Sequence, residues 1–440
     1  MTDRDFKLDR RGLLAGLGTS ILVPAMLPRA VAQQRTAVML RARPGAAVLH
    51  PGRPDTPVWL LQGPETGMRF RRGDQLDVTL GNELPVPVVL SWRGIDGVAA
   101  AEPLAARPPL APGSSDTFPM PLRHAGTFLC DLRSLGDNLA LPSPVRAFVV
   151  RENEPVAVDR DEIVLIEDWR LRPDGSAVAP GSDATDATPL YTVNGNASQD
   201  IATSANARLR LRFINACQRD IIALKIEDHN LQVMAIDSQP SEPFLARNGQ
   251  LVLAPGTRID AFVDTILPPG STSSILLHDG TETRPIGRLV YSAAAPLRTG
   301  PLPPAAPLPS NGLPAQLDLR NALRVDLILG GTGSPADWRM PVNFSVASTP
   351  AFRAKPGRTV VLALTSGADS PTVFHLHGHH FRLLDRLDDG WKPFWLDTLV
   401  IAAGQTQRIA FAAETAGRWL IESVATNWAA PRRVRWYSVE

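Results

Sequence analysis

The stretch FRAKPGRTVVLALTSGA, which runs from Phe352 to Ala368, is one of three copies of the same pattern in the chain. Each copy has a turn of basic or small residues, then alternating apolar positions, then a polar turn. The other copies are MRFRRGDQLDVTLGNEL, which starts at Met68, and ATSANARLRLRFINAC, which starts at Ala202. Because alternating apolar positions are typical of half-buried strands, the pattern predicts three related β units.

A second element follows each copy along the chain. It is APGSSDTFPMPLRHAGTF from Ala111, APGTRIDAFVDTIL from Ala254 and AAGQTQRIAFAAETAGRW from Ala402. Each begins with a Pro/Gly or Gly turn and continues as a strand of alternating character. Three copies spaced by about 140 residues indicate an all-β protein of three related β-sandwich domains.

The composition agrees with this interpretation and excludes several classes of function. The chain has 440 residues, of which 44% are hydrophobic and 20% charged, and its net charge is +1. These values are typical of a soluble globular protein and give no electrostatic basis for binding nucleic acid. The 41 prolines and 33 glycines suit a turn-rich β structure.

The N-terminus carries the pattern of a targeting segment. Arg10 and Arg11 precede an apolar run from Gly12 to Met26, and small residues at Ala30 and Ala32 offer a cleavage site after Ala32. We expect a twin-arginine signal peptide over residues 1–32, hence passage through the Tat export machinery and a periplasmic mature chain. An uncleaved membrane anchor is the alternative. No later run is long enough for an integral membrane segment.

Changes in composition predict the domain boundaries. The polar stretch RENEPVAVDRDE starts at Arg151, and a Pro-rich stretch extends from Ser292 to Pro314. A polar stretch from Arg172 to Pro189 is expected to be a solvated loop, and Cys130 and Cys217 are expected to be buried free thiols. The predicted parts are domain 1 (33–153), domain 2 (154–296), a Pro-rich linker (297–316) and domain 3 (317–440).

The segment FHLHGHH, from Phe374 to His380, holds four of the eight histidines. On a strand, His375, His377 and His379 would face one side, and a His-x-His pair can bind copper or zinc. A pair is still incomplete, because such centres use three or four protein ligands. We interpret His379 and His380 as structural or surface residues. The isolated histidines are interpreted as ordinary ones: His50, His124, His229 and His278.

With these motifs in order along the chain, the sequence resembles the multicopper oxidases, which include laccases, bilirubin oxidases and copper-efflux oxidases. The resemblance is carried by TVFHLHGHHFRLL from Thr372, WLDTLVIAAGQTQRIAFAAETAGRWLIES from Trp395 and GDQLDVTLGNELPVPVVLSWRGI from Gly73. It implies three cupredoxin-like Greek-key sandwiches. It also implies oxidation of a substrate at a blue copper and dioxygen reduction at a trinuclear cluster between the first and third domains.

The family's four histidine-rich motifs are present here only in outline. His-Trp-His-Gly reads SWRG from Ser91, and Tyr-His-Ser-His is replaced by CDLR from Cys130. The third motif keeps His375 and His377, and His-Cys-His reads ESV from Glu422. The positions at which the resemblance implies a lost ligand are Ser91, Arg93, Asp131, Arg133, Thr372, Glu422, Ser423, Val424, Trp428 and Arg433.

These replacements predict that no copper site of the family's kind assembles. A blue copper needs a thiolate and two imidazoles, whereas this chain offers Ser423, Thr372 and Trp428. We therefore expect no cofactor, or copper if the family activity is retained. We expect Arg93, Arg133, Asp131 and Glu422 to converge as a salt-bridge network that replaces the metal between the first and third domains, since arginine binds carboxylates bidentately.

The remaining histidines can be interpreted in two ways. His375 and His377 are expected to be partners of Asp131 and Glu422 in the network. Alternatively, they form a remodelled single-metal site with one of these carboxylates, as two histidines and a carboxylate can hold iron or zinc.

Three functions follow from these interpretations. The first is a non-catalytic binding or scaffold protein for a periplasmic or envelope protein partner, similar to the copper-free cell-division protein of the SufI/FtsP type. The second is a copper-dependent oxidoreductase of the laccase type. The third is a protein with the remodelled metal site.

Overall fold

Strands make up nearly all of the regular structure, as the repeated pattern predicts. The computed structural model describes residues 35–440 except 51, 53, 65–66, 136–140, 331–336 and 385–390. The short helical elements of the described chain are three single 3-10 turns: η1 (Ala99–Ala101), η2 (Arg247–Gly249) and η3 (Pro341–Asn343). No helix in this described part is long and apolar enough to cross a membrane. The predicted export signal, residues 1–32, lies outside the described residues.

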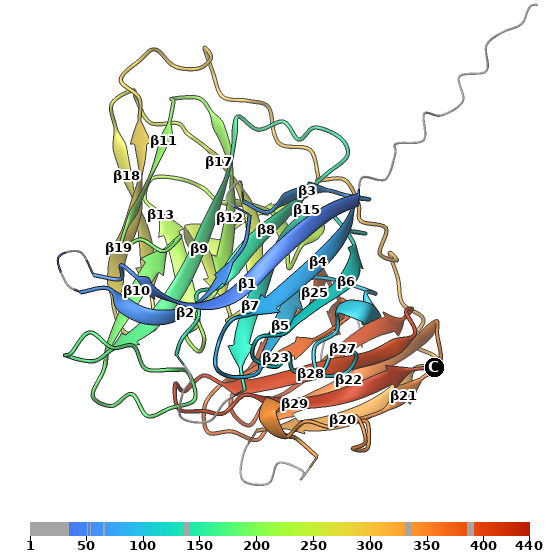
Figure 1. The fold of residues 1–440 in the computed structure, drawn as a ribbon. Helices are drawn as coiled ribbons and strands as arrows, with labels where there is room; N and C mark the ends of the chain where they lie inside the picture. The colour runs from blue at the N-terminus through green and yellow to red at the C-terminus, as the bar shows by residue number, and fades with distance from the viewer. Residues whose placement is uncertain are drawn as a thin grey trace, which may run out of the picture. The chain divides into compact units, whose positions relative to one another are not determined.

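The first sandwich, blue to cyan in Figure 1, has two four-stranded sheets. Their strand orders are β2-β1-β4-β6 and β3-β8-β7-β5. The strands are β1 (Arg35–Ala47), β2 (Thr56–Gln62), β3 (Arg69–Arg71), β4 (Gln75–Asn82), β5 (Val88–Arg93), β6 (Ser115–Pro121), β7 (Gly126–Ser134) and β8 (Arg146–Arg151).

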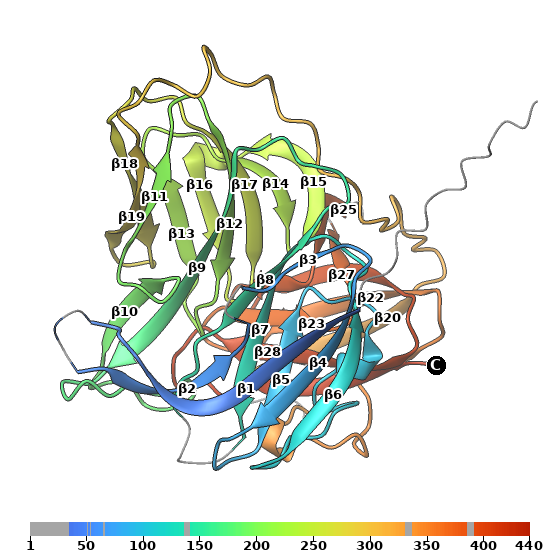
Figure 2. The same ribbon diagram turned by 45° about the horizontal axis from the view of Figure 1, so that its top comes forward.

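The second sandwich, green to yellow in Figure 2, has a six-stranded sheet and a five-stranded sheet. Their orders are β10-β9-β12-β17-β14-β15 and β11-β19-β18-β13-β16. The strands are β9 (Arg160–Leu171), β10 (Thr188–Val193), β11 (Gln199–Thr203), β12 (Arg208–Asn215), β13 (Ile222–Ile226), β14 (Gln232–Ile236), β15 (Gln239–Leu245), β16 (Gln250–Leu253), β17 (Arg258–Asp264), β18 (Thr272–His278) and β19 (Thr283–Tyr291).

The third sandwich, orange to red, has two five-stranded sheets. Their orders are β20-β22-β27-β24-β25 and β21-β29-β28-β23-β26. The strands are β20 (Leu323–Leu329), β21 (Arg353–Ala354), β22 (Arg358–Ser366), β23 (Thr372–Leu376), β24 (Phe381–Leu384), β25 (Trp391–Leu396), β26 (Thr398–Ile401), β27 (Thr406–Ala413), β28 (Gly417–Ala425) and β29 (Arg433–Val439).

The three sequence repeats become three equivalent strand triplets. The first repeat elements form β4, β12 and β22, and each pairs antiparallel with the strand of its second element, β6, β17 or β27. Each also pairs parallel with an earlier strand, β1, β9 or β20. The apolar positions of each triplet enter a separate buried cluster, so each sandwich has its own core. This confirms the predicted all-β class of three cupredoxin-like sandwiches.

Strand β12 shows how one alternating sequence serves both a core and a domain contact. Leu209, Leu211 and Phe213 enter the core of the second sandwich. On the opposite face, Arg210 and Arg212 are fully buried and lie 2.6 and 2.9 Å from Asp260 Oδ2. The same arginines reach the first sandwich, because Arg210 also binds Glu152 and Arg212 donates to Thr127 Oγ1. Buried guanidiniums need such partners, so β12 fixes the two sandwiches together.

The Pro-rich connector is anchored by one buried side chain. Asn311 is 5% exposed, and its amide donates to Ala125 O at 2.9 Å and Ser238 O at 3.1 Å. Its Oδ1 accepts from Ala125 N at 2.9 Å. Upstream in the connector, Leu308 is buried against β14 and β17 side chains. The connector is therefore held against both the first and the second sandwich.

The polar stretch from Arg172 to Pro189 differs from the solvated loop that we predicted. Ala177 and Val178 within it are buried, and Ala177 packs in one cluster with Leu49 and Val58 of the first sandwich. Two small apolar residues in a row are enough to dock the loop although its other residues are polar. The expected thiols are confirmed, since Cys130 and Cys217 are both buried and free.

Gly378 lies where the first and third sandwiches touch, and it allows one prediction about the fold. Its φ is +76°, and a Cβ added there would lie 2.1 Å from a ring carbon of Trp419, which is 1% exposed. We expect Gly378→Ala to lower the free energy of unfolding by about 3 kcal/mol or more, from overpacking added to backbone strain. Urea unfolding would measure the loss.

The matched control is Gly404→Ala. Gly404 has φ +67° and open space around its Cβ position. This variant should lose only about 1–2 kcal/mol, the usual penalty of the left-handed backbone. Equal losses in the two variants would contradict the packing argument.

Candidate functional site

The predicted site residues lie where the β5–β7 pair of the first sandwich meets the β23–β28 pair of the third. In the first, β5 pairs with β7 so that Ser91 lies opposite Asp131. In the third, β23 pairs with β28 so that His375 lies opposite Glu422. Figure 2 shows β7 beside β28, and ion pairs that link Arg93 and Arg133 to Glu422 join the two sheets.

Glu422 is the centre of an ion cluster buried at this junction. Its side chain is 2% exposed and accepts a hydrogen bond from Arg133 Nη1. Arg432 Nη1 donates to its other oxygen, Oε2, at 2.9 Å, and Arg93 Nη2 lies 3.5 Å from the same atom. His377 Nε2 lies 3.4 Å from Oε1. One carboxylate therefore faces three guanidiniums and one imidazole. We call these five residues the Glu422 cluster.

The cluster holds its carboxylate strongly in the charged form. Burial opposes ionisation of Glu422, yet Arg133 and Arg432 hold the pKa of its carboxyl well below its usual range. Arg133 has a second partner, since its Nε donates to Asp131 Oδ2 at 2.8 Å. Despite burial, Glu422 and Asp131 raise the pKa of the Arg133 guanidinium. The structure thus brings Arg93, Arg133, Asp131 and Glu422 together.

His377 joins the cluster to the first sandwich through a carboxylate that the sequence did not reveal. Its Nδ1 lies 3.0 Å from Glu102 Oε1, which also accepts a hydrogen bond from Leu420 N at 2.9 Å. Burial disfavours the charged ring, but Glu102 and Glu422 outweigh it and raise the pKa of His377 to about 9. The imidazolium therefore lies between two carboxylates of different domains.

His375 has other partners than those we expected. Its Nδ1 lies 2.9 Å from the carbonyl oxygen of Asp397 and 3.2 Å from Thr398 Oγ1. Burial, and then the positive charge of Arg93, lower the pKa of His375 to about 3, so the ring is neutral. The predicted pairing of His375 with Asp131 or Glu422 is wrong, because the segment between β25 and β26 presents a backbone acceptor to the ring. Its ring centroid is 4.7 Å from that of His377.

The remaining predicted positions have no part in the Glu422 cluster. Ser91, Ser423 and Val424 are buried, as is Thr372, whose Oγ1 lies 2.9 Å from Ser366 Oγ. Arg433 lies opposite Ser423 in the β28–β29 pair. Trp428 is half-buried beneath the guanidinium of Arg170, which lies 4.6 Å from its ring centroid. Among the described residues, the predicted positions that lie within ion-pair distance of a partner are Arg93, Asp131, Arg133, Glu422, His377 and His375, whose Nδ1 is 3.6 Å from Asp397 Oδ1.

A second buried ion group joins the second and third sandwiches, and no sequence motif indicated it. Arg258 is fully buried and binds both oxygens of Asp397, at 2.9 and 2.7 Å. Asp237 Oδ1 lies 3.5 Å from Arg258 Nη1. The local sequence around Arg258, Asp237 and Asp397 is typical of strands and turns, and only the tertiary structure brings these residues together.

A third polar group contains His124, which we interpreted as an ordinary histidine, and His380, which we interpreted as a structural or surface residue. Asp96 Oδ2 lies 2.5 Å from His380 Nδ1 and 3.6 Å from His124 Nδ1, and His380 Nε2 lies 2.6 Å from Asp237 O. Burial disfavours the charged ring of His380, but Asp96 outweighs this effect and raises the pKa of His380 to about 9. Within the described chain, these three are the one set of histidine, cysteine or acidic residues close enough to share a metal ion. His379 and His380 are both buried, which excludes a surface role.

The charge of His377 generates a pH-dependent prediction. The pKa of His377 is raised to about 9, whereas an unfolded histidine titrates near 6.5. Its stabilising contribution is therefore complete below about pH 6.5 and is lost as the pH rises through about 9. Against His377→Gln, the wild type should be more stable by on the order of 3 kcal/mol below about pH 6.5, and this difference should shrink as the pH rises to about 9.

Chemical unfolding at a series of pH values would measure the difference. The control is His278→Gln, because His278 has no carboxylate partner in the described part of the chain. The change with pH for His377→Gln should exceed that for this control. A constant difference for His377→Gln would refute the charged pairing.

Comparisons with known proteins agree with this architecture. Family models described as multicopper oxidase match residues 160–272 and 322–432. The multicopper oxidase MmcO of Mycobacterium tuberculosis is 22% identical over 403 residues, which cover 80% of this chain and 77% of that protein.

A fungal enzyme and a solved structure extend the likeness. A laccase of Trametes maxima is 24% identical over 387 residues, which cover 71% of this chain and 73% of that protein. The crystal structure of a multi-copper oxidase from Pseudomonas thermotolerans matches with a TM-score of 0.76 and 24% identity, covering 92% of this chain and 99% of that one. With two family models that together span half of the sequence, the chain belongs to the multicopper oxidase family.

Proposed function

We propose that this chain is a copper-free, non-catalytic member of the multicopper oxidases that acts as a binding or scaffold protein. The observation that carries the proposal is the Glu422 cluster. Four of its five members occupy positions where the resemblance implies a copper ligand, and they are paired with one another. Ion pairs that close the junction in this way hold the domains in one rigid body, and the surface of that body is available for binding.

The residues present do not fit the family's trinuclear copper cluster. Arg93 and Arg133 carry guanidiniums, which have no lone pair to give a metal and would repel a cation beside it. Arg432 adds a third positive charge 2.9 Å from Glu422. His375 and His377 each use Nδ1 for a protein oxygen, so each ring has only Nε2 left for a metal. Two imidazoles beside three guanidiniums are a poor donor set for several copper ions.

The residues do not fit a blue copper either. Such a centre needs a cysteine thiolate and two imidazoles, and the corresponding residues are Ser423, Thr372 and Trp428. The Thr372 hydroxyl is already engaged with Ser366. We therefore derive no electron transfer through this region.

In the proposed role, the Glu422 cluster replaces metal as the connection between the first and third sandwiches. A buried ion group adds little net stability, but removing one partner leaves an uncompensated charge. Such a group specifies one docking geometry. The twin-arginine pattern supports a place in the periplasm, and a periplasmic or envelope protein is the partner that we propose for the scaffold.

The alternative is a copper-dependent oxidoreductase of the laccase type. The names of the relatives favour it, since MmcO and the Trametes maxima protein are called a multicopper oxidase and a laccase. A remodelled single-metal site at His375 and His377 is less well supported. These two residues and Glu422 are not among the described residues whose ligand atoms converge as a metal set would require.

The copper content tests the proposal directly. We expect protein exported from copper-supplemented cells to contain no near-stoichiometric copper and to lack the intense blue absorption of a copper–thiolate site. Elemental analysis would measure the copper content. Any copper that remains should be unaffected by the double variant His375→Gln/His377→Gln. Several copper ions per chain, lost in the double variant, would contradict the proposal.

The structural role of the cluster gives a second prediction. Glu422→Gln removes the shared carboxylate and leaves the surrounding guanidiniums unbalanced, so the free energy of unfolding should fall by about 3–5 kcal/mol. The control is Glu162→Gln, which breaks a surface pair with Arg160 and should cost about 1 kcal/mol or less. Denaturant unfolding measures both. If Glu422→Gln behaves like its control, the cluster does not hold the junction.

A further inference from the structure

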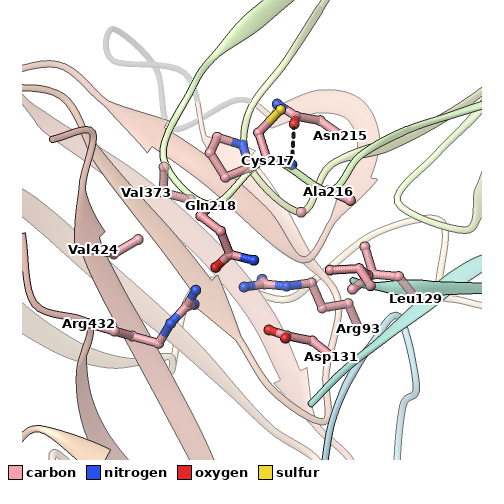
Figure 3. Close-up of a pocket in the computed structure, with 13 residues that line it drawn as sticks. Arg93, Leu129, Asp131, Asn215, Ala216, Cys217, Gln218, Val373, Val424 and Arg432 are labelled. Atoms are coloured by element: carbon pink, nitrogen blue, oxygen red, sulfur yellow. Dashed lines mark hydrogen bonds between the residues drawn. The ribbon is translucent and has the colours of Figure 1, made fainter. Parts of the chain in front are cut away.

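A pocket of about 540 Å³ opens beside the Glu422 cluster. Strand β7 contributes Asp131 and Arg133, the loop after β12 contributes Arg219, and the loop before β29 contributes Arg432. Its volume is in the range of pockets that hold small organic ligands. The smaller cavity in Figure 3 adjoins it, because Asp131, Gln218 and Arg432 line both.

The pocket has more positive than negative charge. Arg133 and Arg432 share Glu422, which also serves Arg93 and His377, and Asp131 pairs with Arg133 alone. Arg219 has no carboxylate within ion-pair distance among the described residues. Its guanidinium donates hydrogen bonds to the carbonyl oxygens of Gln218 at 2.7 Å and Ala430 at 2.9 Å. One guanidinium is thus left without a counter-charge.

Buried hydrogen-bond donors remain unused at the same place. Arg219 is 3% exposed, and its Nε–H has no partner in the described structure. Arg133 Nη2 and Arg93 Nη1 are also buried without a partner there. Figure 3 shows the guanidiniums of Arg93 and Arg432 directed toward the amide of Gln218. Unsatisfied buried donors are costly, so a group that accepts hydrogen bonds would be stabilised here.

Electrostatics agree with this interpretation. Burial, and then repulsion from Arg432, lower the pKa of Arg219 to about 9. Burial likewise lowers the pKa of Arg93 to about 10, although Glu422 opposes the shift. Carboxylates in excess would instead raise the pKa of every arginine nearby, as they do for Arg133. Burial is the main cause of both lowered pKa values, and repulsion between neighbouring guanidiniums adds to it.

The other walls of the pocket are apolar. Leu135 and Leu141 line it from the first sandwich, and Met340, Val342 and Pro431 from the third. Met340 and Val342 are each 42% exposed, which is high for apolar side chains. A ligand that contacts both parts of the pocket would need an anionic end and an apolar body.

We propose that this pocket binds a small organic carboxylate, with its anionic group on Arg219 and Arg432 and its apolar part against Met340 and Val342. A planar guanidinium matches a carboxylate in a bidentate arrangement, and the apolar walls favour an organic body over an inorganic anion. The inference deepens the proposed binding function, on which it rests, by naming the class of ligand.

Isothermal titration of the full mature chain with benzoate tests the proposal. Benzyl alcohol serves as the neutral counterpart of similar shape, and sulfate and inorganic phosphate serve as anions without an apolar body. At constant ionic strength we expect saturable binding of benzoate and none of benzyl alcohol. Absence of benzoate binding up to about 10 mM would overturn the proposal. Equal or tighter binding of sulfate or phosphate would overturn the assignment to carboxylates.

Two variants locate the site. Arg219→Gln removes the unpaired guanidinium and should weaken benzoate binding about tenfold or more. Met340→Asp places a negative charge on an exposed position of the rim, where folding should tolerate it, and should weaken binding as well. The matched control Arg288→Gln removes an exposed arginine of β19, which pairs with Asp200, and should bind benzoate like the wild type. Unchanged binding in both site variants would place the ligand elsewhere.

Copper content measured on the same samples separates the two proposals. Copper-free protein that does not bind benzoate would overturn the carboxylate site and leave the proposed function standing. Protein that is loaded with copper through His375 and His377 would overturn the proposed function, whatever the titration gives.

Discussion

The junction of the first and third sandwiches depends on one carboxylate, that of Glu422, which stays charged although it is buried. The group is 2% exposed, so its charge is tolerated only because Arg133, Arg432, Arg93 and His377 surround it. Transferring an unpaired carboxylate into such a place costs several kcal/mol even after relaxation. The cations come from four strands or loops of two sandwiches. Their mutual position is therefore fixed by one anion.

The same arrangement explains why the surroundings of the cluster are polar. Glu102 neutralises the far side of His377, and Asp131 satisfies the second edge of Arg133. The positive charges are not fully compensated, since the hydrogen bonds of Arg219 go to carbonyl oxygens and not to a carboxylate. A positive surplus remains on the side that opens to the pocket. Stability of the junction and recognition of an anion are thus two consequences of one charge distribution.

The sequence predicted the parts of this structure that depend on local pattern or on the family's motif order. The strands β4, β12 and β22 follow from alternation within each repeat. Likewise, Arg93, Arg133 and Glu422 could be expected to meet, because the resemblance assigns them to one site. Local pattern could not reveal Glu102, which lies in a short irregular segment and meets His377 only in the folded chain.

Partners that depend on side-chain direction were beyond sequence reasoning. His375 lies opposite Glu422 in strand register, yet its ring bonds the carbonyl of Asp397. The pairing of Asp96 with His380 spans 284 positions, and no motif connects them. Such contacts result from how the three sandwiches dock. Docking is set by buried arginines such as Arg258. The sequence of the strand that holds Arg258 has no feature that distinguishes it from other β-strands.

The most direct test of the account is a crystal structure of protein prepared with excess copper, with anomalous data collected at the copper absorption edge. The account predicts no anomalous peak within bonding distance of His375 or His377. It also predicts that the Glu422 carboxylate lies within hydrogen-bonding distance of the Arg133 and Arg432 guanidiniums. Copper peaks between the two histidines, with these arginines turned away from Glu422, would contradict it.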